Sequence, residues 1–449
     1  MTPDVVVVGA GFAGLSAAAR LADAGRRVLV LEARPQLGGR ATAFADRVTG
    51  ELVDNGQHVL FGCYNQTFAF LKRIGAEGYV RRQPALRVPF MDRTGARSLL
   101  ECPALPPPLH LLGAVLTWKA MSWRDRASVM RMVPSLRAAR RALFTTGRVA
   151  IDGEPTVAEW LRARGQTERL TAWLWEPLAL AALNQSTDEA LATPFVRVIA
   201  EMFGPDRTAS AIALPIRPLH EMYAEPARAF IERRGGAVRT GALARVLTDG
   251  TRVAGVDVRG ERISSSHVLA AVPWNGIRTL FAEPVPAALV RLVADAGAMS
   301  SKPIVTVNLW YDRRVMDDSF VGLPGRSMQW VFDKRLAFGR ESSHLSLVAS
   351  GADALTSVRA DDLISRAAAE IEEAIPGARG ATLVRGTVIR EKHATFSLAA
   401  GQPARPQTAT GIDGLWLAGD WIDTGLPGTI ESAVVSGHRA AKAMLNAEC

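Results

Sequence analysis

Apolar runs at both ends of the chain are followed by glycine-rich turns, a pattern that predicts strands leading into helices. Near the start, Val5–Val8 is a continuous β-branched run, typical of a strand that is buried on both faces. A glycine-rich turn and a helical stretch then lead to a second apolar run, Val28–Leu31. Near the other end, the apolar run Leu415–Ala418 precedes a turn and a helix expected from about Thr429. Both ends therefore predict the strand–turn–helix units of an α/β fold.

The middle of the chain supplies further strand-like segments. Residues 235–274 alternate between apolar and polar positions like consecutive strands, and Asp249-Gly250 marks a hairpin between two of them. Strand-like runs follow at Ile304–Tyr311 and Leu345–Ala349, and a helix is expected from Ala360. A second unit of strands and helices is therefore expected between the two ends.

The turn after the first strand has the pattern G-x-G-x-x-G. In dinucleotide-binding units the first glycine permits the turn, the second lets a pyrophosphate approach the backbone, and the third lets helix and strand pack closely. The N-terminus of the helix offers free N–H groups and a positive dipole to the phosphates. A glutamate at the end of the second strand can bind both ribose hydroxyls and disfavours a 2′-phosphate. The predicted dinucleotide site consists of Gly9, Ala10, Gly11, Phe12, Ala13, Gly14, Glu32, Ala33 and Arg34.

The segment ARPQLGGRAT, residues 33–42, distinguishes an FAD site from an NAD site. It resembles the second signature of the FAD-dependent amine oxidase and phytoene desaturase superfamily, and plain nicotinamide dehydrogenases lack it. In that superfamily the arginine of this signature reaches the FAD pyrophosphate. The resemblance implies this role for Arg40, beside Gly39, and makes FAD the expected cofactor.

The segment GLWLAGDWIDTGLPGTIESAVVSGHRAAKAML, residues 414–445, is similar to the third FAD motif of the same superfamily. The similarity implies that Asp420, after Gly419, bonds the ribityl or phosphate region of FAD. It also implies that the following helix points its N-terminus at the pyrimidine edge of the flavin. The N–H groups near Thr429 and Ile430 would then stabilise negative charge on the reduced flavin.

Because the FAD motifs lie at opposite ends of the chain, the cofactor domain must be discontinuous. The resemblance implies a doubly wound, Rossmann-like FAD-binding domain of the glutathione reductase type, with an inserted α+β substrate domain. In the superfamily the middle of the chain returns to the FAD domain, where one backbone position contacts adenine, and Leu243 is the matching residue. The expected ranges are 1–75, 225–295 and 385–449 for the FAD domain, and 76–224 and 296–384 for the substrate domain.

The segment DNGQHVLFGCY, residues 54–64, places a polar cluster in a stretch that otherwise reads as buried. A glycine at position 56 permits close approach of the backbone to a flat ring. The segment resembles the G-L-H-x-F-F-G-x-Y-x-N segment of plant-type carotene desaturases. It is still more similar to that of squalene-associated FAD-dependent desaturases of bacterial hopanoid gene clusters, the hydroxysqualene dehydroxylases. The stretch WEPLALAALNQSTDEALA from Trp175 likewise resembles a segment that lines the substrate tunnel of those proteins.

Three polar residues of this segment are candidates for catalysis. His58 is either the general acid that protonates a leaving hydroxyl or a residue that positions the flavin. Carotene desaturases, which remove hydrogen, also carry this histidine, and that favours the positioning role. Asp54 is a second candidate acid. Gln57 replaces the leucine of the carotene enzymes, so we expect it to recognise a hydroxyl group.

The resemblance implies reductive dehydroxylation of hydroxysqualene to squalene, with hydride delivered by reduced FAD, in squalene and hopanoid biosynthesis. The alternative is a carotene desaturase, which oxidises a polyprenoid. A flavin amine oxidase is disfavoured because Gly425-Leu426-Pro427 stands where the amine cage would need paired aromatics. The sequence shows no second dinucleotide motif, and the donor that reduces FAD is not readable from it.

Charge and composition add an expectation about membranes. The formal net charge is +9, without a nucleic-acid-binding motif, and Cys63, Cys102 and Cys449 suggest neither a disulfide framework nor a metal site. No stretch reads as a signal peptide or membrane span. Residues 105–145 combine an apolar run with tryptophan and arginine, which is typical either of helices lying on a membrane or of amphipathic helices in a cap. We expect a cytoplasmic protein, peripheral at the inner face of the membrane.

Overall fold

A five-stranded parallel sheet holds the segments that carry the glycine motifs. The computed structural model describes residues 2–339 and 341–447. The sheet has the order β10-β2-β1-β14-β20, and each pair of neighbours is parallel. Its strands are β1 (Val5–Val8), β2 (Val28–Leu31), β10 (Ala237–Arg239), β14 (Val268–Ala270) and β20 (Leu415–Leu417). The sheet therefore combines strands from both ends of the chain with strands from its middle.

Alternate side chains of β1 pack into two different layers, because successive residues of a strand point to opposite faces. Val5 and Val7 belong to a core shared with three helices, and Val6 and Val8 to a core shared with a three-stranded antiparallel sheet. The helices are α1 (Phe12–Asp23), α10 (Glu225–Glu232) and α14 (Ile430–Ala447). The strands are β11 (Ala244–Thr248), β12 (Val253–Val258) and β13 (Glu261–Ser264), with the predicted hairpin between β11 and β12. The expected α/β fold is confirmed.

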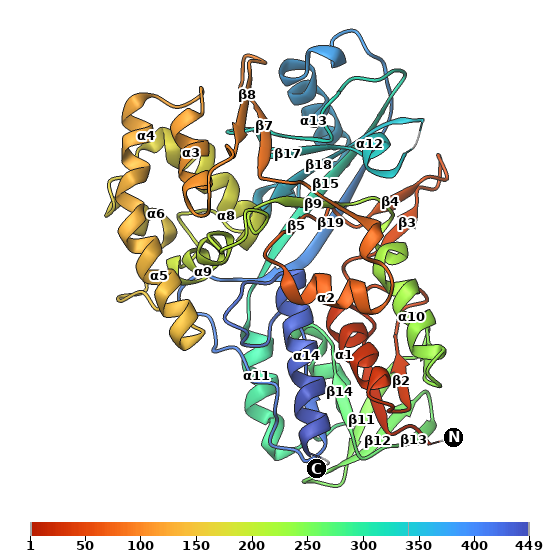
Figure 1. Cartoon of the computed structure of the whole chain (residues 1–449). Coiled ribbons are helices and arrows are strands. Elements are labelled where there is room, and N and C mark those ends of the chain that lie inside the picture. The colour runs from red at the N-terminus through yellow and green to blue at the C-terminus, as the bar shows by residue number, and fades with distance from the viewer. Residues whose placement is uncertain (1, 340, 448–449) are drawn as a thin grey trace.

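Helices α1 and α14 lie side by side although they come from opposite ends of the chain (Figure 1). A side chain at Gly437 of α14 would meet the carbonyl oxygen of Ala13 at 2.3 Å, so only glycine permits this approach. Each helix follows a strand of the parallel sheet, β1 or β20. Both N-termini therefore lie at the carboxyl edge of the sheet, where α/β proteins bind ligands.

A second sheet of seven strands forms the other half of the molecule, in the order β19-β15-β18-β17-β16-β7-β8. Helix α13 (Ala360–Ala374) buries Leu363 and Ile371 in the same core as Val305 and Val307 of this sheet. Strand β19 pairs with β15 along most of its length and so crosses the domain boundary predicted near residue 385. The strands are β7 (Arg87–Met91), β8 (Arg97–Glu101), β15 (Ser301–Tyr311), β16 (Phe320–Gly322), β17 (Trp330–Asp333), β18 (Ser343–Ser350) and β19 (Leu383–Phe396).

Helices of residues 109–202 form a layer beside the seven-stranded sheet, seen at the left of Figure 1. The apolar run within residues 105–145 forms helix α3 (Leu109–Thr117). Helix α4 (Trp123–Val129) follows, and its N-terminus is fixed by a capping box between Ser122 and Asp125. The remaining helices of the layer are α5 (Val133–Thr146), α6 (Val157–Arg162), α7 (Glu168–Leu170), α8 (Glu176–Leu183) and α9 (Ala192–Met202).

The polar segment 54–64 connects two small sheets that lie between the halves of the molecule. It leaves β4 (Leu52–Asp54), which pairs with β3 (Ala43–Ala45), and continues into β5 (Leu60–Phe61). Strand β5 pairs with β9 (Ile212–Pro215), which also pairs with β6 (Val80–Arg82). Helix α2 (Asn65–Arg73) follows β5 in the chain. Helices α11 (Val290–Ala298) and α12 (Lys334–Phe338) complete the elements used below. Cys63 and Cys102 are free thiols, and Cys449 lies outside the described residues.

Candidate active site

Both ends of the chain line one cavity of about 560 Å³, a volume typical of a ligand site. Of the residues predicted to bind the cofactor, only Gly14 does not line it. Asp54, proposed as a catalytic residue, does not line it either. The predicted residues that meet at the cavity are Gly9, Ala10, Gly11, Phe12, Ala13, Glu32, Ala33, Arg34, Gly39, Arg40, Gly56, Gln57, His58, Leu243, Gly419, Asp420, Thr429 and Ile430.

The three glycines of the first turn have different surroundings, which match the three roles predicted for them. Gly9 has a φ of +108°, and a Cβ atom there would meet the Ala271 carbonyl oxygen at 2.4 Å. At Gly14 a Cβ atom would meet the Gly9 carbonyl oxygen at 1.9 Å, so this glycine permits the contact of helix and strand. At Gly11 a Cβ atom would meet nothing within 4 Å, and this residue faces the cavity. The turn thus leaves room for a bound group where a pyrophosphate is expected.

Glu32 is held in place by the backbone at the end of β2. Its two carboxylate oxygens accept hydrogen bonds from the N–H groups of Ala10, at 2.8 Å, and of Arg34, at 3.0 Å. The carboxylate is buried and borders the cavity, so it is positioned for the ribose hydroxyls predicted to bind there.

Tyr223 supports the same region, and sequence reasoning missed it. Its ring stacks on Phe12 with 3.6 Å between the ring centroids, and its hydroxyl donates to the Gly38 carbonyl oxygen at 2.7 Å. Tyr223 therefore joins the first and second FAD motifs. No local pattern around residue 223 indicates this role, because the contact depends on how distant segments pack.

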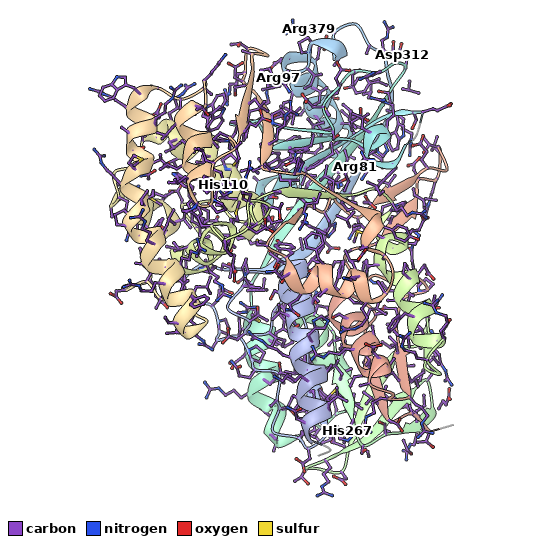
Figure 2. The ribbon with its side chains drawn as sticks, viewed as in Figure 1. Arg81, Arg97, His110, His267, Asp312 and Arg379 are labelled. Atoms are coloured by element: carbon purple, nitrogen blue, oxygen red, sulfur yellow. The ribbon has the colours of Figure 1, made fainter. Side chains whose placement is uncertain are left out.

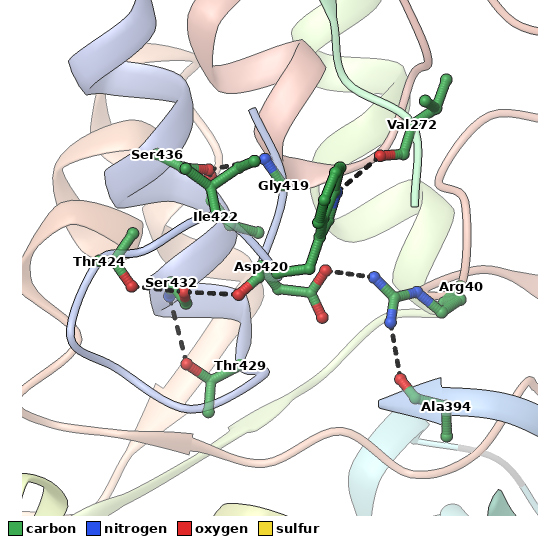
Figure 3. Close-up of polar contacts among 12 residues, drawn as sticks. Arg40, Val272, Ala394, Gly419, Asp420, Ile422, Thr424, Thr429, Ser432 and Ser436 are labelled. Carbon is green, nitrogen blue, oxygen red and sulfur yellow. Dashed lines mark hydrogen bonds and ion pairs between the residues drawn. The ribbon is translucent and has the colours of Figure 1, made fainter. Parts of the chain in front are cut away.

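Arg40 and Asp420 form an ion pair at the centre of the cofactor region (Figure 3). The Arg40 Nη2 atom lies 2.5 Å from the Asp420 Oδ1 atom, and Nη1 donates to the Ala394 carbonyl oxygen at 2.7 Å. The guanidinium also lies over the ring of Trp274, 5.4 Å from its centroid. Burial lowers the pKa of Arg40, but the nearby Asp420 and Glu391 carboxylates oppose burial, and the net effect raises the pKa. A fixed positive charge therefore borders the cavity where the FAD pyrophosphate is expected.

The loop that carries Asp420 is anchored to helix α14 by side chains of that helix (Figure 3). Ser436 Oγ accepts from the Gly419 N–H at 2.9 Å, and Ser432 Oγ donates to the Asp420 carbonyl oxygen at 3.0 Å. Thr429 Oγ1 accepts from the Ser432 N–H at 3.2 Å and caps the helix. Since Thr429 and Ile430 line the cavity, the positive end of the helix dipole faces the cavity, where the flavin is expected.

Asp54 lies behind the cavity wall and not on it. Its Oδ2 atom lies 2.6 Å from the Nζ atom of Lys334, and its Oδ1 atom accepts from the Leu219 N–H at 3.2 Å. Both side chains are almost fully buried. The general-acid role considered for Asp54 therefore has no support in this geometry, because the carboxylate faces a lysine and a backbone amide instead of the cavity.

Gln57 and His58 do line the cavity. The Gln57 Oε1 atom accepts from Lys334 Nζ at 2.6 Å, and Gln57 Nε2 donates to the His58 carbonyl oxygen at 3.0 Å. The His58 Nδ1 atom lies 3.1 Å from the Gly56 carbonyl oxygen. Burial lowers the pKa of His58 below its ordinary 6.5, although Asp54 and the Gly56 carbonyl oppose this. A neutral ring that donates from Nδ1 fits a positioning role better than that of a general acid.

A large apolar part of the cavity wall comes from the part of the molecule that contains the seven-stranded sheet and the helical layer. Strands of the seven-stranded sheet and helices α8 and α9 supply it, with Leu86, Val88, Phe90, Leu100, Leu178, Met202, Phe320, Trp330, Phe332 and Val348. Asn184 also lines the cavity, but its amide bonds the Lys302 carbonyl oxygen, Thr395 and the Gly351 N–H. Asn184 is thus engaged by the protein itself. His267 does not line the cavity and lies at the lower end of the molecule (Figure 2).

The profile of the flavin containing amine oxidoreductase family matches residues 12–445. The hydroxysqualene dehydroxylase of Rhodopseudomonas palustris is 32% identical, over 100% of this chain and 99% of its own. That of Sinorhizobium fredii is 28% identical, over 99% of each chain. A probable zeta-carotene desaturase of Synechococcus elongatus is 25% identical, also over 99% of each.

Among solved structures, an oxidoreductase from Methanosarcina mazei has a TM-score of 0.74, with 18% identity over 98% of this chain and 99% of its own. These matches, with the geometry above, define an FAD-dependent oxidoreductase. The chain belongs to the flavin containing amine oxidoreductase family.

Proposed function

We propose that this chain reduces hydroxysqualene to squalene and water. One hydride replaces the hydroxyl group on carbon, and one proton leaves with that hydroxyl as water. The observation that carries the proposal is the continuity of one cavity, in which the residues expected to hold FAD meet a long apolar wall. The relatives named hydroxysqualene dehydroxylase, which match the whole chain, support this choice of substrate.

The reduced form of FAD, when bound, supplies the hydride. The chain itself binds and orients the cofactor and the substrate, and it excludes water from the site. Arg40 and the N-terminus of α14 border the cavity and would hold the negatively charged parts of the cofactor. The apolar wall around Phe90 and Trp330 holds the hydrocarbon and keeps water out, which strengthens electrostatic interactions at the reacting end. Gln57 stands among the cofactor residues and offers a polar contact to a hydroxyl group.

The test is a product assay with two substrates. Protein reconstituted with FAD is kept anaerobic, reduced photochemically and mixed with detergent-dispersed hydroxysqualene, and products are identified by mass spectrometry. A parallel sample holds oxidised protein with phytoene. Squalene in the first sample alone is the expected result. Dehydrogenated phytoene in the second sample, with no squalene in the first, would assign the chain to carotene desaturation instead.

We also propose that the helical layer docks on an anionic membrane surface at the cytoplasmic face. The segment expected to dock, residues 105–145, holds seven Lys or Arg residues against one Asp, a net charge of +6 out of the chain's +9. Side chains of this layer are exposed although they are large and apolar, among them Trp123 at 74% and Phe144 at 93%. Aromatic side chains among arginines are typical of helices at the lipid headgroups. In the part of the chain that the structure describes, no helix combines the length and apolarity needed to span a bilayer.

Sedimentation with lipid vesicles tests this docking. We expect binding to vesicles that contain anionic lipid, weakening as salt is raised, and a clear loss of binding in a Trp123→Ser, Phe144→Ser double variant. Val384 in β19 is 67% exposed but lies in the other half of the molecule, so Val384→Ser is the matched control. Equal loss of binding in the control and the double variant would contradict the proposed surface.

A further inference from the structure

A buried lysine contacts the one amide among the candidate catalytic residues. Lys334 is the first residue of α12, whose N-terminus is capped by the Asp333 carboxylate. Its side chain is 1% exposed, and its Nζ atom lies 2.6 Å from both Asp54 Oδ2 and Gln57 Oε1. Lys334 does not line the cavity, whereas Gln57, which it contacts, does.

An ammonium group can only donate hydrogen bonds, whereas a glutamine amide has one oxygen that accepts and one nitrogen that donates. Lys334 therefore requires the oxygen of Gln57 to face it. The nitrogen must then lie on the other side of the amide, and it donates one hydrogen to the His58 carbonyl oxygen at 3.0 Å. Among the described residues no other group accepts from Gln57 Nε2, which leaves its second hydrogen for a ligand.

We infer that Lys334 is a positioning residue that makes Gln57 a hydrogen-bond donor to an alcohol oxygen, and so gives the cavity its preference for a hydroxylated hydrocarbon. The inference rests on the proposed function and adds the residue that sets substrate specificity. Without Lys334 the Gln57 amide could turn over and offer its oxygen. A donor is also the group that stabilises a hydroxyl oxygen as its bond to carbon weakens.

Asp54 completes the arrangement by neutralising Lys334. An unpaired ammonium at this depth would be very unfavourable, and the Asp54 carboxylate is fixed in turn by the Leu219 N–H. The polar residues of segment 54–64 and Lys334 therefore have different roles. Asp54 holds Lys334, Lys334 orients Gln57, and Gln57 faces the ligand.

The test compares two ligands that differ by one hydroxyl group. Dissociation constants of FAD-loaded, oxidised protein for hydroxysqualene and for squalene are measured from the change in flavin absorbance. We expect the wild-type protein to bind hydroxysqualene about tenfold more tightly than squalene. In Gln57→Leu this preference should disappear, with squalene affinity retained. In Lys334→Met it should fall to about twofold or less.

Controls separate this role from a purely structural one. The double variant Asp54→Leu, Lys334→Met removes the pair together and avoids a lone buried charge, and it should lose the preference while keeping its FAD content. Lys302 also pairs with two carboxylates, Glu189 and Asp353, and lies outside the cavity wall, so Lys302→Met should keep the full preference.

A full preference that survives in either Gln57→Leu or Lys334→Met, in a protein that converts hydroxysqualene, would overturn this inference alone. Wild-type protein that neither prefers nor converts hydroxysqualene would overturn the inference and the proposed function together.

Discussion

Arg40 and Asp420 are 380 positions apart in the chain, yet their side chains meet at 2.5 Å. Arg40 belongs to the second FAD motif and Asp420 to the third. Each residue is also bonded to a different element, since the Arg40 side chain donates to the Ala394 carbonyl oxygen of β19 and the Ser432 side chain of α14 donates to the backbone carbonyl oxygen of Asp420. This one ion pair therefore joins the two ends of the chain and the seven-stranded sheet at the cavity.

The first prediction follows from this ion pair. In Arg40→Lys the planar guanidinium is lost, and one ammonium cannot reproduce its bonds to Asp420 and Ala394 together with a pyrophosphate contact. We expect the dissociation constant of FAD to rise about tenfold to a hundredfold, measured by titration calorimetry of the apoprotein. The exposed pair of Arg27 with Asp4 has similar chemistry far from the cavity, so Arg27→Lys should leave FAD affinity unchanged. Equal effects at both positions would contradict a specific role for Arg40.

The second prediction separates two glycines of the first turn. Gly14→Ala places a methyl group 1.9 Å from the Gly9 carbonyl oxygen, so it should lower the free energy of unfolding by about 1–3 kcal/mol or more. Gly11→Ala meets nothing within 4 Å and should fold normally, but its methyl group projects into the cavity and should weaken FAD binding.

Thermal unfolding of the apoproteins and flavin titration measure the two effects. Gly297→Ala in α11 is a suitable control for both, because the site is open and helical. If Gly11→Ala bound FAD as tightly as the wild-type protein, the position assigned to the pyrophosphate would be wrong.

The third prediction concerns His58. Because burial lowers its pKa and its Nδ1 atom bonds the Gly56 carbonyl, the ring is expected to be neutral at pH 7 and to position its surroundings. Turnover in His58→Gln should therefore fall by less than about tenfold, whereas loss of a general acid costs about 10²–10⁴. The measurement is kcat as a function of pH for both proteins at saturating FAD. A hundredfold loss that removes one limb of the pH profile would restore the general-acid role.

The fourth prediction is an acid sensitivity that arises in helix α14. Burial, together with the charges of Arg73 and Arg20, lowers the pKa of His438 from 6.5 to about 4. The unfolded chain then binds a proton more readily than the folded protein between these values, so stability falls as the pH drops from 6.5 towards 4. The full effect is at most about 3 kcal/mol.

Urea unfolding at pH 7 and pH 4.5 measures this effect. His438→Gln should lose less stability between the two pH values than the wild-type protein does. His393 is exposed and bonds Ser301 Oγ, so His393→Gln should keep the wild-type sensitivity. Identical pH dependence in all three proteins would show that His438 does not take part.

The cofactor half of the site could be predicted from the sequence because its determinants are local. Gly9 stands at a fixed spacing after one strand, and Glu32 stands at the end of the next strand. Their roles follow from the local geometry of a strand–turn–helix unit and can be predicted without the tertiary fold. Tyr223 and Lys334 could not be found in this way, since each acts through residues that only the tertiary fold brings near. Asp54 is the opposite case, a residue that sequence reasoning assigned to catalysis although the tertiary fold gives it another place. Its sequence position suggested catalysis, but the fold turns its carboxylate towards Lys334.

The central claim is that one cavity joins FAD to a hydroxylated hydrocarbon and that the chain runs in the reductive direction. A single-turnover experiment tests it most directly. Photoreduced, FAD-loaded protein is mixed anaerobically with hydroxysqualene, and flavin absorbance and squalene are followed together. We expect one squalene to form for each flavin that becomes oxidised. Reoxidation without squalene, or no reoxidation at all while oxidised protein is bleached by phytoene, would contradict it.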